Sequence, residues 1–114
     1  MNIIKTIPEE LSKKALYDLT MSPKSRKMSE CEGSVLEIKA ACIYADTDRN
    51  GELRTVLSVL TPEGEIFATN SPTFREDFER MVDLFGPDGV TAIEIISGTS
   101  KAGRKFFTCA YAGD

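Results

Sequence analysis

The sequence predicts a mainly β fold, in which five strands form a small barrel and one helix lies between the third and fourth strands. Three observations support this prediction. After residue 33, five runs are rich in β-forming residues, turn signals separate these runs, and a single apolar stripe at helical spacing interrupts them. The 114 residues, 41% hydrophobic and 28% charged, suffice for one domain with one hydrophobic core.

Residues 1–33 differ from the rest and form the first predicted unit, a short N-terminal helix with a basic arm. Thr6-Ile7-Pro8-Glu9 has the spacing of a helix capping box, and four apolar residues then recur at helical spacing: Leu11, Ala15, Leu16 and Leu19. We therefore expect a helix that ends near Leu19. Residues 20–27 are polar and basic and contain Pro23, which predicts an extended arm or loop.

Residues 34–114 form the second predicted unit, with strands expected at 34–45, 53–61, 65–70, 90–97 and 106–112. Asn50-Gly51 between the first two strands is a strong hairpin signal, because both residues tolerate the backbone of a tight turn. Pro62-Glu63-Gly64 predicts the next turn. A basic loop with two glycines, residues 98–105, joins the last two strands.

The predicted main helix begins at a capping box, Thr73-Phe74-Arg75-Glu76, and ends at Gly86-Pro87. Its apolar stripe consists of Phe74, Phe78, Met81, Val82 and Phe85. Three strands, a helix and two strands follow one another in the oligonucleotide-binding (OB) fold, a five-stranded Greek-key barrel. The sequence therefore predicts an OB-fold-like barrel over residues 34–114, and a mixed α+β sheet is the alternative.

Catalysis is not expected of this chain, because the usual catalytic groups are absent. The sequence contains no histidine, so it has no imidazole base and no serine–histidine or cysteine–histidine pair. Residues 46–51 resemble the opening of a calcium loop, but the twelfth position, which needs a bidentate glutamate, is Leu57. The three cysteines lack metal-site spacing. We expect no catalytic residue, no metal and no cofactor.

The net charge is −4, yet the charges are unevenly distributed. Residues 1–30 carry six basic and four acidic side chains, and residues 97–107 carry three basic side chains and no acid. Such a chain can present a cationic face despite its negative total. No apolar run is long enough to cross a bilayer, and the N-terminus lacks the apolar stretch of a signal peptide, so we expect a cytoplasmic protein without membrane contact.

The candidate binding residues follow from the OB-like prediction, in which the ligand face is built around the second and third strands and two flanking loops. Proteins of this kind bind single strands with cations along the phosphates and aromatic rings under the bases. The candidate cations are Lys101, Arg104 and Lys105 in the last loop, Arg49 and Arg54 beside them, and Lys24, Arg26 and Lys27 in the arm.

The candidate stacking rings are Phe106, Tyr44 and Phe67. Because neighbours on a strand point to opposite faces, Phe107 is expected in the core with Cys109 and Tyr111, which leaves Phe106 outside. Tyr44 and Phe67 could instead be core aromatics, and the loop cations could be ordinary solubilising charges.

Several stretches also resemble a known family. They include Gly33-Ser34-Val35-Leu36-Glu37, Ala68-Thr69-Asn70-Ser71, the run from Ile95 to Arg104, and the N-terminal Ile7-Pro8-Glu9 and Leu19-Thr20-Met21-Ser22-Pro23. Together they are similar to small phage- and prophage-encoded single-stranded DNA-binding proteins of Gram-positive bacteria. The resemblance implies a replication or recombination protein that works in the host cytoplasm and coats exposed strands without reading their sequence.

The expected partner is therefore single-stranded DNA, with RNA left open, and the chain is expected to act as a homo-oligomer or a cooperative array on the strand. The alternative hypothesis is an acidic protein-binding module, for instance a phage factor that captures a host protein by imitating DNA. The acidic face of the predicted main helix, with Glu76, Asp77, Glu79 and Asp83, motivates this alternative.

Overall fold

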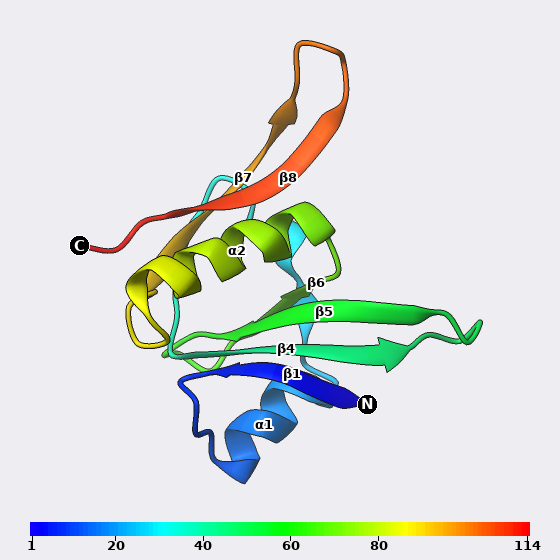
Figure 1. Cartoon of the computed structure of the whole chain (residues 1–114), viewed down its shortest axis with the longest axis vertical. Coiled ribbons are helices and arrows are strands. Elements are labelled where there is room, and N and C mark those ends of the chain that lie inside the picture. Colours follow the sequence, from blue (N-terminus) through cyan, green and yellow to red (C-terminus); the bar gives the residue numbers. More distant parts are fainter.

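The structure is a computed structural model that describes residues 1–114, and its strands form two sheets (Figure 1). The five-stranded sheet has the order β1 (Asn2–Ile7), β4 (Ala40–Thr47), β5 (Leu53–Leu60), β6 (Ile66–Thr69) and β2 (Arg26–Lys27). The three-stranded sheet has the order β3 (Val35–Glu37), β7 (Ala92–Thr99) and β8 (Lys105–Tyr111). The predicted mainly β fold is confirmed, but neither sheet closes into a barrel.

The two sheets are joined where the predicted first strand, residues 34–45, breaks into β3 and β4. The N–H of Ile38 donates to the carbonyl oxygen of Thr91, next to the small sheet, at 2.9 Å. The N–H of the next residue, Lys39, donates to the carbonyl oxygen of Leu60 in β5, also at 2.9 Å. The chain therefore passes from one sheet to the other within two residues.

The helix α2 (Pro72–Phe85) lies between the two sheets (Figure 1) and buries most of its apolar stripe there, but Phe85 at its end is 45% exposed. Phe74, Phe78 and Val82 are buried in a core of 14 residues that both sheets supply. The N-cap is Ser71, two residues before the predicted N-cap Thr73, because the Ser71 side chain accepts a hydrogen bond from the N–H of Phe74 and Pro72 occupies the first turn.

The helix predicted from residue 6 is wrong at its start, because the chain first forms β1. This strand pairs with β4 from Asn2 to Ile7. β-branched residues favour a strand there, and the following Pro8 cannot donate to a ladder. The helix α1 (Lys13–Thr20) begins after Ser12, whose hydroxyl oxygen accepts from the N–H of Ala15 at 3.1 Å.

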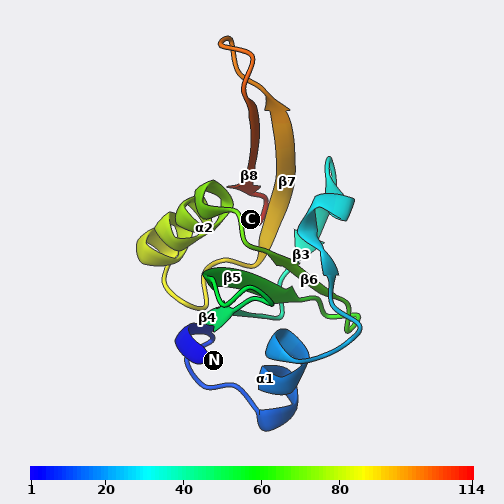
Figure 2. The same ribbon diagram turned by 90° about the vertical axis from the view of Figure 1, so that its right-hand side faces the viewer.

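A second, smaller core fixes α1 against the five-stranded sheet. It consists of Leu19 from the helix and four residues of the sheet: Ala40, Cys42, Leu60 and Ile66. Figure 2 shows α1 below β4 and β5, on the side away from α2. The helix α1 thus covers part of the face of the five-stranded sheet that points away from α2. The β4–β5 turn extends beyond this helix (Figure 1).

The last two residues of the predicted basic arm, Arg26 and Lys27, form an ordered strand that continues into a short helix, and we call residues 26–31 the strap. It consists of β2, which pairs in parallel with β6, and the 3₁₀ helix η1 (Met28–Cys31). Met28 is fully buried in the main core. The predicted division at residue 33 therefore separates two sequence patterns, whereas residues 1–33 supply two strands and core side chains to the same body.

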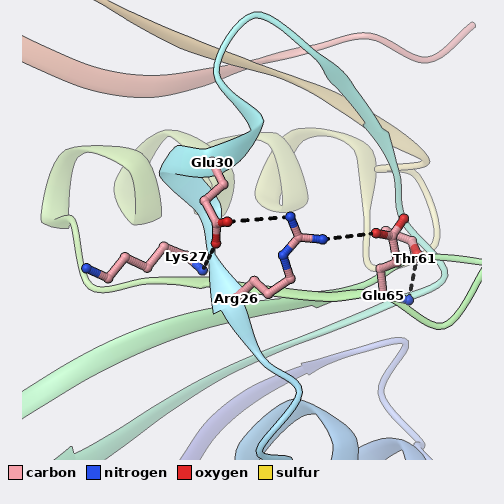
Figure 3. Close-up of polar contacts among 5 residues, drawn as sticks. All are labelled: Arg26, Lys27, Glu30, Thr61 and Glu65. Carbon is pink, nitrogen blue, oxygen red and sulfur yellow. Dashed lines mark hydrogen bonds and ion pairs between the residues drawn. The ribbon is translucent and has the colours of Figure 1, made fainter.

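One ion pair joins the strap to the residue before β6, and a second lies within the strap (Figure 3). The Arg26 guanidinium lies 3.4 Å from a carboxylate oxygen of Glu30 and 3.5 Å from one of Glu65, and it lies over the ring of Phe67. The other oxygen of Glu30 accepts from the backbone N–H of Lys27 at 3.1 Å. The charge of Arg26 is thus engaged within the protein.

Neither α1 nor α2 is long and apolar enough to cross a bilayer.

Candidate nucleic-acid interface

Two hollows lie next to each other, and together we call them the groove. Their volumes are about 610 and 630 Å³, and both are lined by Ser29, Ser71 and Phe107. Ser29 comes from the strap, Ser71 caps α2, and Phe107 comes from β8. The groove therefore lies where the strap, the start of α2 and the β7–β8 hairpin meet.

The first hollow extends from these shared residues to β4 and β5. Tyr44 and Val56, which are paired across these strands, form its wall together with Arg54 and the strap residue Lys27. The first hollow contains two cations and no acidic side chain. Neither Lys27 nor Arg54 forms an ion pair in the protein. A negatively charged ligand would therefore meet two cations without an ion pair here, although Asp46 is the ladder partner of Arg54.

The Tyr44 hydroxyl in this hollow remains a proton donor at neutral pH. Burial raises the pKa of Tyr44 above its ordinary value of 10.0, the nearby Cys42 and Asp46 raise it further, and Arg54 lowers it. The side chain is partly buried, because it packs against the second core beside Cys42, and the residue lines the first hollow.

The second hollow extends from the shared residues along the β7–β8 hairpin. Lys105, Phe106 and Gly98 line it, and Glu32 is its only acidic residue. Phe106 is 42% exposed, as the strand alternation predicts. Phe107 packs against the main core, where its ring stacks on that of Phe74 with centroids 4.9 Å apart. One aromatic side chain of this hollow is therefore exposed, and its neighbour is anchored.

Lys101 and Arg104 lie at the tip of the hairpin, beyond the lining of the groove. The tip is an ordered turn, since the N–H of Ser100 donates to the Arg104 carbonyl at 2.8 Å and the N–H of Gly103 donates to the Ser100 carbonyl at 2.9 Å. Gly103 has a φ of +82°, which favours glycine. Figures 1 and 2 show that the hairpin projects from the body, so these exposed cations extend the positive charge of Lys105 outwards.

The remaining predicted residues lie outside the groove. Phe67 is 3% exposed and belongs to the main core, so the prediction that its ring could stack on a base is corrected. Arg26 is held by two carboxylates, as described above. Arg49, at the β4–β5 turn, and Lys24, before the strap, are exposed without an ion pair but do not line either hollow.

Sequence reasoning missed several residues that line the groove. Phe107 was expected only in the core, yet it lines both hollows while it packs on Phe74. Small polar residues, namely Ser29, Thr69, Asn70, Ser71 and Thr73, supply hydroxyl and amide groups between the aromatic side chains. Of these, Thr73 had a signal as the predicted start of the main helix, two residues after the N-cap Ser71, and nothing in the sequence indicated that this start faces β8.

The groove thus combines unpaired cations, three aromatic side chains and hydrogen-bonding groups, and it lacks a histidine, a cysteine or a cluster of acidic residues that could hold a metal. Its chemistry suits a ligand with negative charges and flat apolar groups. A comparison of the chain with protein-family models, with curated proteins and with solved structures finds no match.

Proposed function

We propose that this protein binds single-stranded DNA in the groove without sequence selectivity. One observation carries the proposal: the two adjoining hollows bring Tyr44 and Phe106 to the same groove as Lys27, Arg54 and Lys105, none of which has an ion-pair partner. Unpaired nucleotides carry both a phosphate charge and an open base face. Each base stacked on an aromatic side chain contributes about 1–3 kcal/mol.

An OB-like arrangement of the strands is part of this proposal. The order β3 and β4, β5, β6, α2, β7, β8 supports it, with β3 and β4 acting as one bent first strand that pairs in both sheets. The β4–β5 and β7–β8 turns then correspond to the two loops that flank the ligand face of such folds. Arg54 in the first hollow and Lys105 in the second come from strands next to these turns.

We further propose that the protein acts in phage-type DNA replication or recombination. The resemblance of residues 95–104 to phage single-strand binders supports this role. Single domains of the OB type cover about 4–16 nucleotides. Because a groove built from two hollows covers a short stretch of strand, we propose that several copies act together along a strand, as an oligomer or a cooperative array.

The test is a titration of a labelled oligothymidine longer than about 16 nucleotides, followed by fluorescence anisotropy. We expect tighter binding to the single strand than to a duplex of the same length. Tyr44→Ala and Phe106→Ala should each weaken binding by about 5- to 150-fold, which corresponds to the loss of one stacked base. Tyr17→Ala is the matched control, because Tyr17 is a 48% exposed aromatic on α1 outside both hollows.

Two results would overturn the proposal: equal affinity for duplex and single strand, or no binding to either. An oligouridine of the same length decides between DNA and RNA. The alternative of an acidic protein-binding module remains a prediction: on α2, Asp77 pairs with Arg80 at 3.5 Å and Asp83 with Lys5 at 3.6 Å, whereas Glu76 and Glu79 form no ion pair.

A further inference from the structure

We infer that Gly98 is a positioning residue, whose missing side chain lets the Phe106 ring lie across β7 and holds it ready for a base. This inference rests on the proposed function, since it assumes that a base stacks on Phe106. It adds a residue that touches no nucleotide and acts only through the ring.

The contact between the two residues is close. Gly98 and Phe106 are direct partners in the β7–β8 ladder, so their side-chain positions share one face of the hairpin. A Cβ atom placed on Gly98 would lie 2.7 Å from Cζ of Phe106, 3.0 Å from Cε1 and 3.4 Å from Cε2. Because these atoms form the far end of the ring, the ring must fold back over the Gly98 backbone rather than extend into solvent.

The backbone itself does not require glycine at this position. Gly98 lies inside a strand and is not among the glycines with positive φ, unlike Gly103 at the hairpin tip. A glycine inside a strand normally weakens it, because the backbone loses more freedom on folding and no side chain packs. The ring of Phe106 covers this exposed backbone, which gives the glycine a packing role.

The consequence for binding is preorganisation. With the far end of its ring against Gly98, Phe106 is still 42% exposed and lines the second hollow with Gly98 and Lys105. A ring that is already held in place loses little side-chain freedom when a base stacks on it. Any side chain at position 98 would lift the ring from the strand and restore that freedom.

The first experiment compares the affinities of Gly98→Ala, Phe106→Ala and the double variant for the labelled oligothymidine. We expect Gly98→Ala to weaken binding by about three- to tenfold, which is the cost of ordering one freed side chain on binding. The double variant should bind no more weakly than Phe106→Ala alone, because Gly98 acts only through the ring. The melting temperature of Gly98→Ala should be unchanged or higher, since alanine lowers the entropy of the unfolded chain.

The second experiment uses the wild-type protein without DNA. A ring over Gly98 shifts the NMR signals of the Gly98 α-protons upfield, and the shift should disappear in Phe106→Ala. If the wild type shows no such shift, the inference is overturned whatever the affinities are. Glu94→Gln, an exposed change elsewhere on β7, should leave the shift in place.

The affinities separate this inference from the proposed function. If Phe106→Ala weakens binding and Gly98→Ala does not, the positioning role is overturned while the stacking role stands. If the loss from Gly98→Ala persists in the Phe106→Ala background, position 98 acts by another route, and the inference is again overturned. If Phe106→Ala has no effect, the stacking role in the proposed function fails, and the positioning role fails with it.

Discussion

The salt dependence of binding gives the sharpest measure of how the groove would hold a phosphate chain. Five cations in the groove or on its hairpin have no ion-pair partner: Lys27, Arg54, Lys101, Arg104 and Lys105. For single strands, each phosphate neutralised contributes about −0.7 to the slope of log affinity against log salt, because bound counterions are released. Five contacts predict a slope of about −3.5.

The perturbation is the double variant Arg104→Gln/Lys105→Gln, which removes two cations from the β7–β8 hairpin and leaves the Phe106 ring. The predicted slope falls to about −2.1. Between about 50 and 200 mM salt, the wild type should lose about 100-fold in affinity, and the variant only about 20-fold. Anisotropy titrations with the same oligothymidine at four or more salt concentrations would give both slopes.

The matched control is Lys13→Gln/Lys39→Gln, which changes the net charge by the same amount. Both lysines are exposed, have no ion-pair partner and lie outside the groove. Its slope should equal that of the wild type. If the control and the hairpin variant lower the slope equally, total charge governs binding and the assignment of phosphates to the groove is refuted.

Two further predictions concern stability. Burial raises the pKa of Cys42 to about 11 and that of Cys109 to about 12. Above pH 9 the unfolded chain loses thiol protons that the folded chain keeps. The free energy of unfolding should therefore fall by about 1.4 kcal/mol per pH unit for each thiol. In urea titrations at several pH values, Cys109→Ala should reduce this dependence on pH. Ser58 carries a buried hydroxyl without a hydrogen-bond partner, so Ser58→Ala should leave the free energy of unfolding unchanged or raise it by about 1 kcal/mol; a clear loss would show that the hydroxyl is bonded.

Local patterns in the sequence predicted the elements whose signals repeat within a few residues. The apolar stripe of α2 was readable because buried residues recur at helical spacing, and Phe74, Phe78 and Val82 are buried as expected. The outward position of Phe106 followed from strand alternation in the same way. Both predictions depend on one element and need no knowledge of its neighbours.

Pairing between distant segments was not readable, and it decided the N-terminal region. A capping-box spacing at residues 6–9 suggested a helix, but pairing with β4 placed residues 2–7 in a strand. The break at Ile38 and Lys39 arises because consecutive N–H groups bond to different sheets. A sequence pattern records the preference of a segment, whereas the partner that completes its hydrogen bonds can lie dozens of residues away.

The residues of the candidate site were also predicted only in part from local patterns. The sequence by itself determined which residue types could contact a strand, including the cationic hairpin and Phe106, and it excluded a histidine-based catalytic site. Only the tertiary structure decided which of them share a groove: packing buried Phe67, two carboxylates engaged Arg26, and the pairing of β2 with β6 carried Lys27 to the wall beside Tyr44. The physical reason is that burial and charge pairing depend on contacts between segments far apart in the chain, which no local pattern encodes.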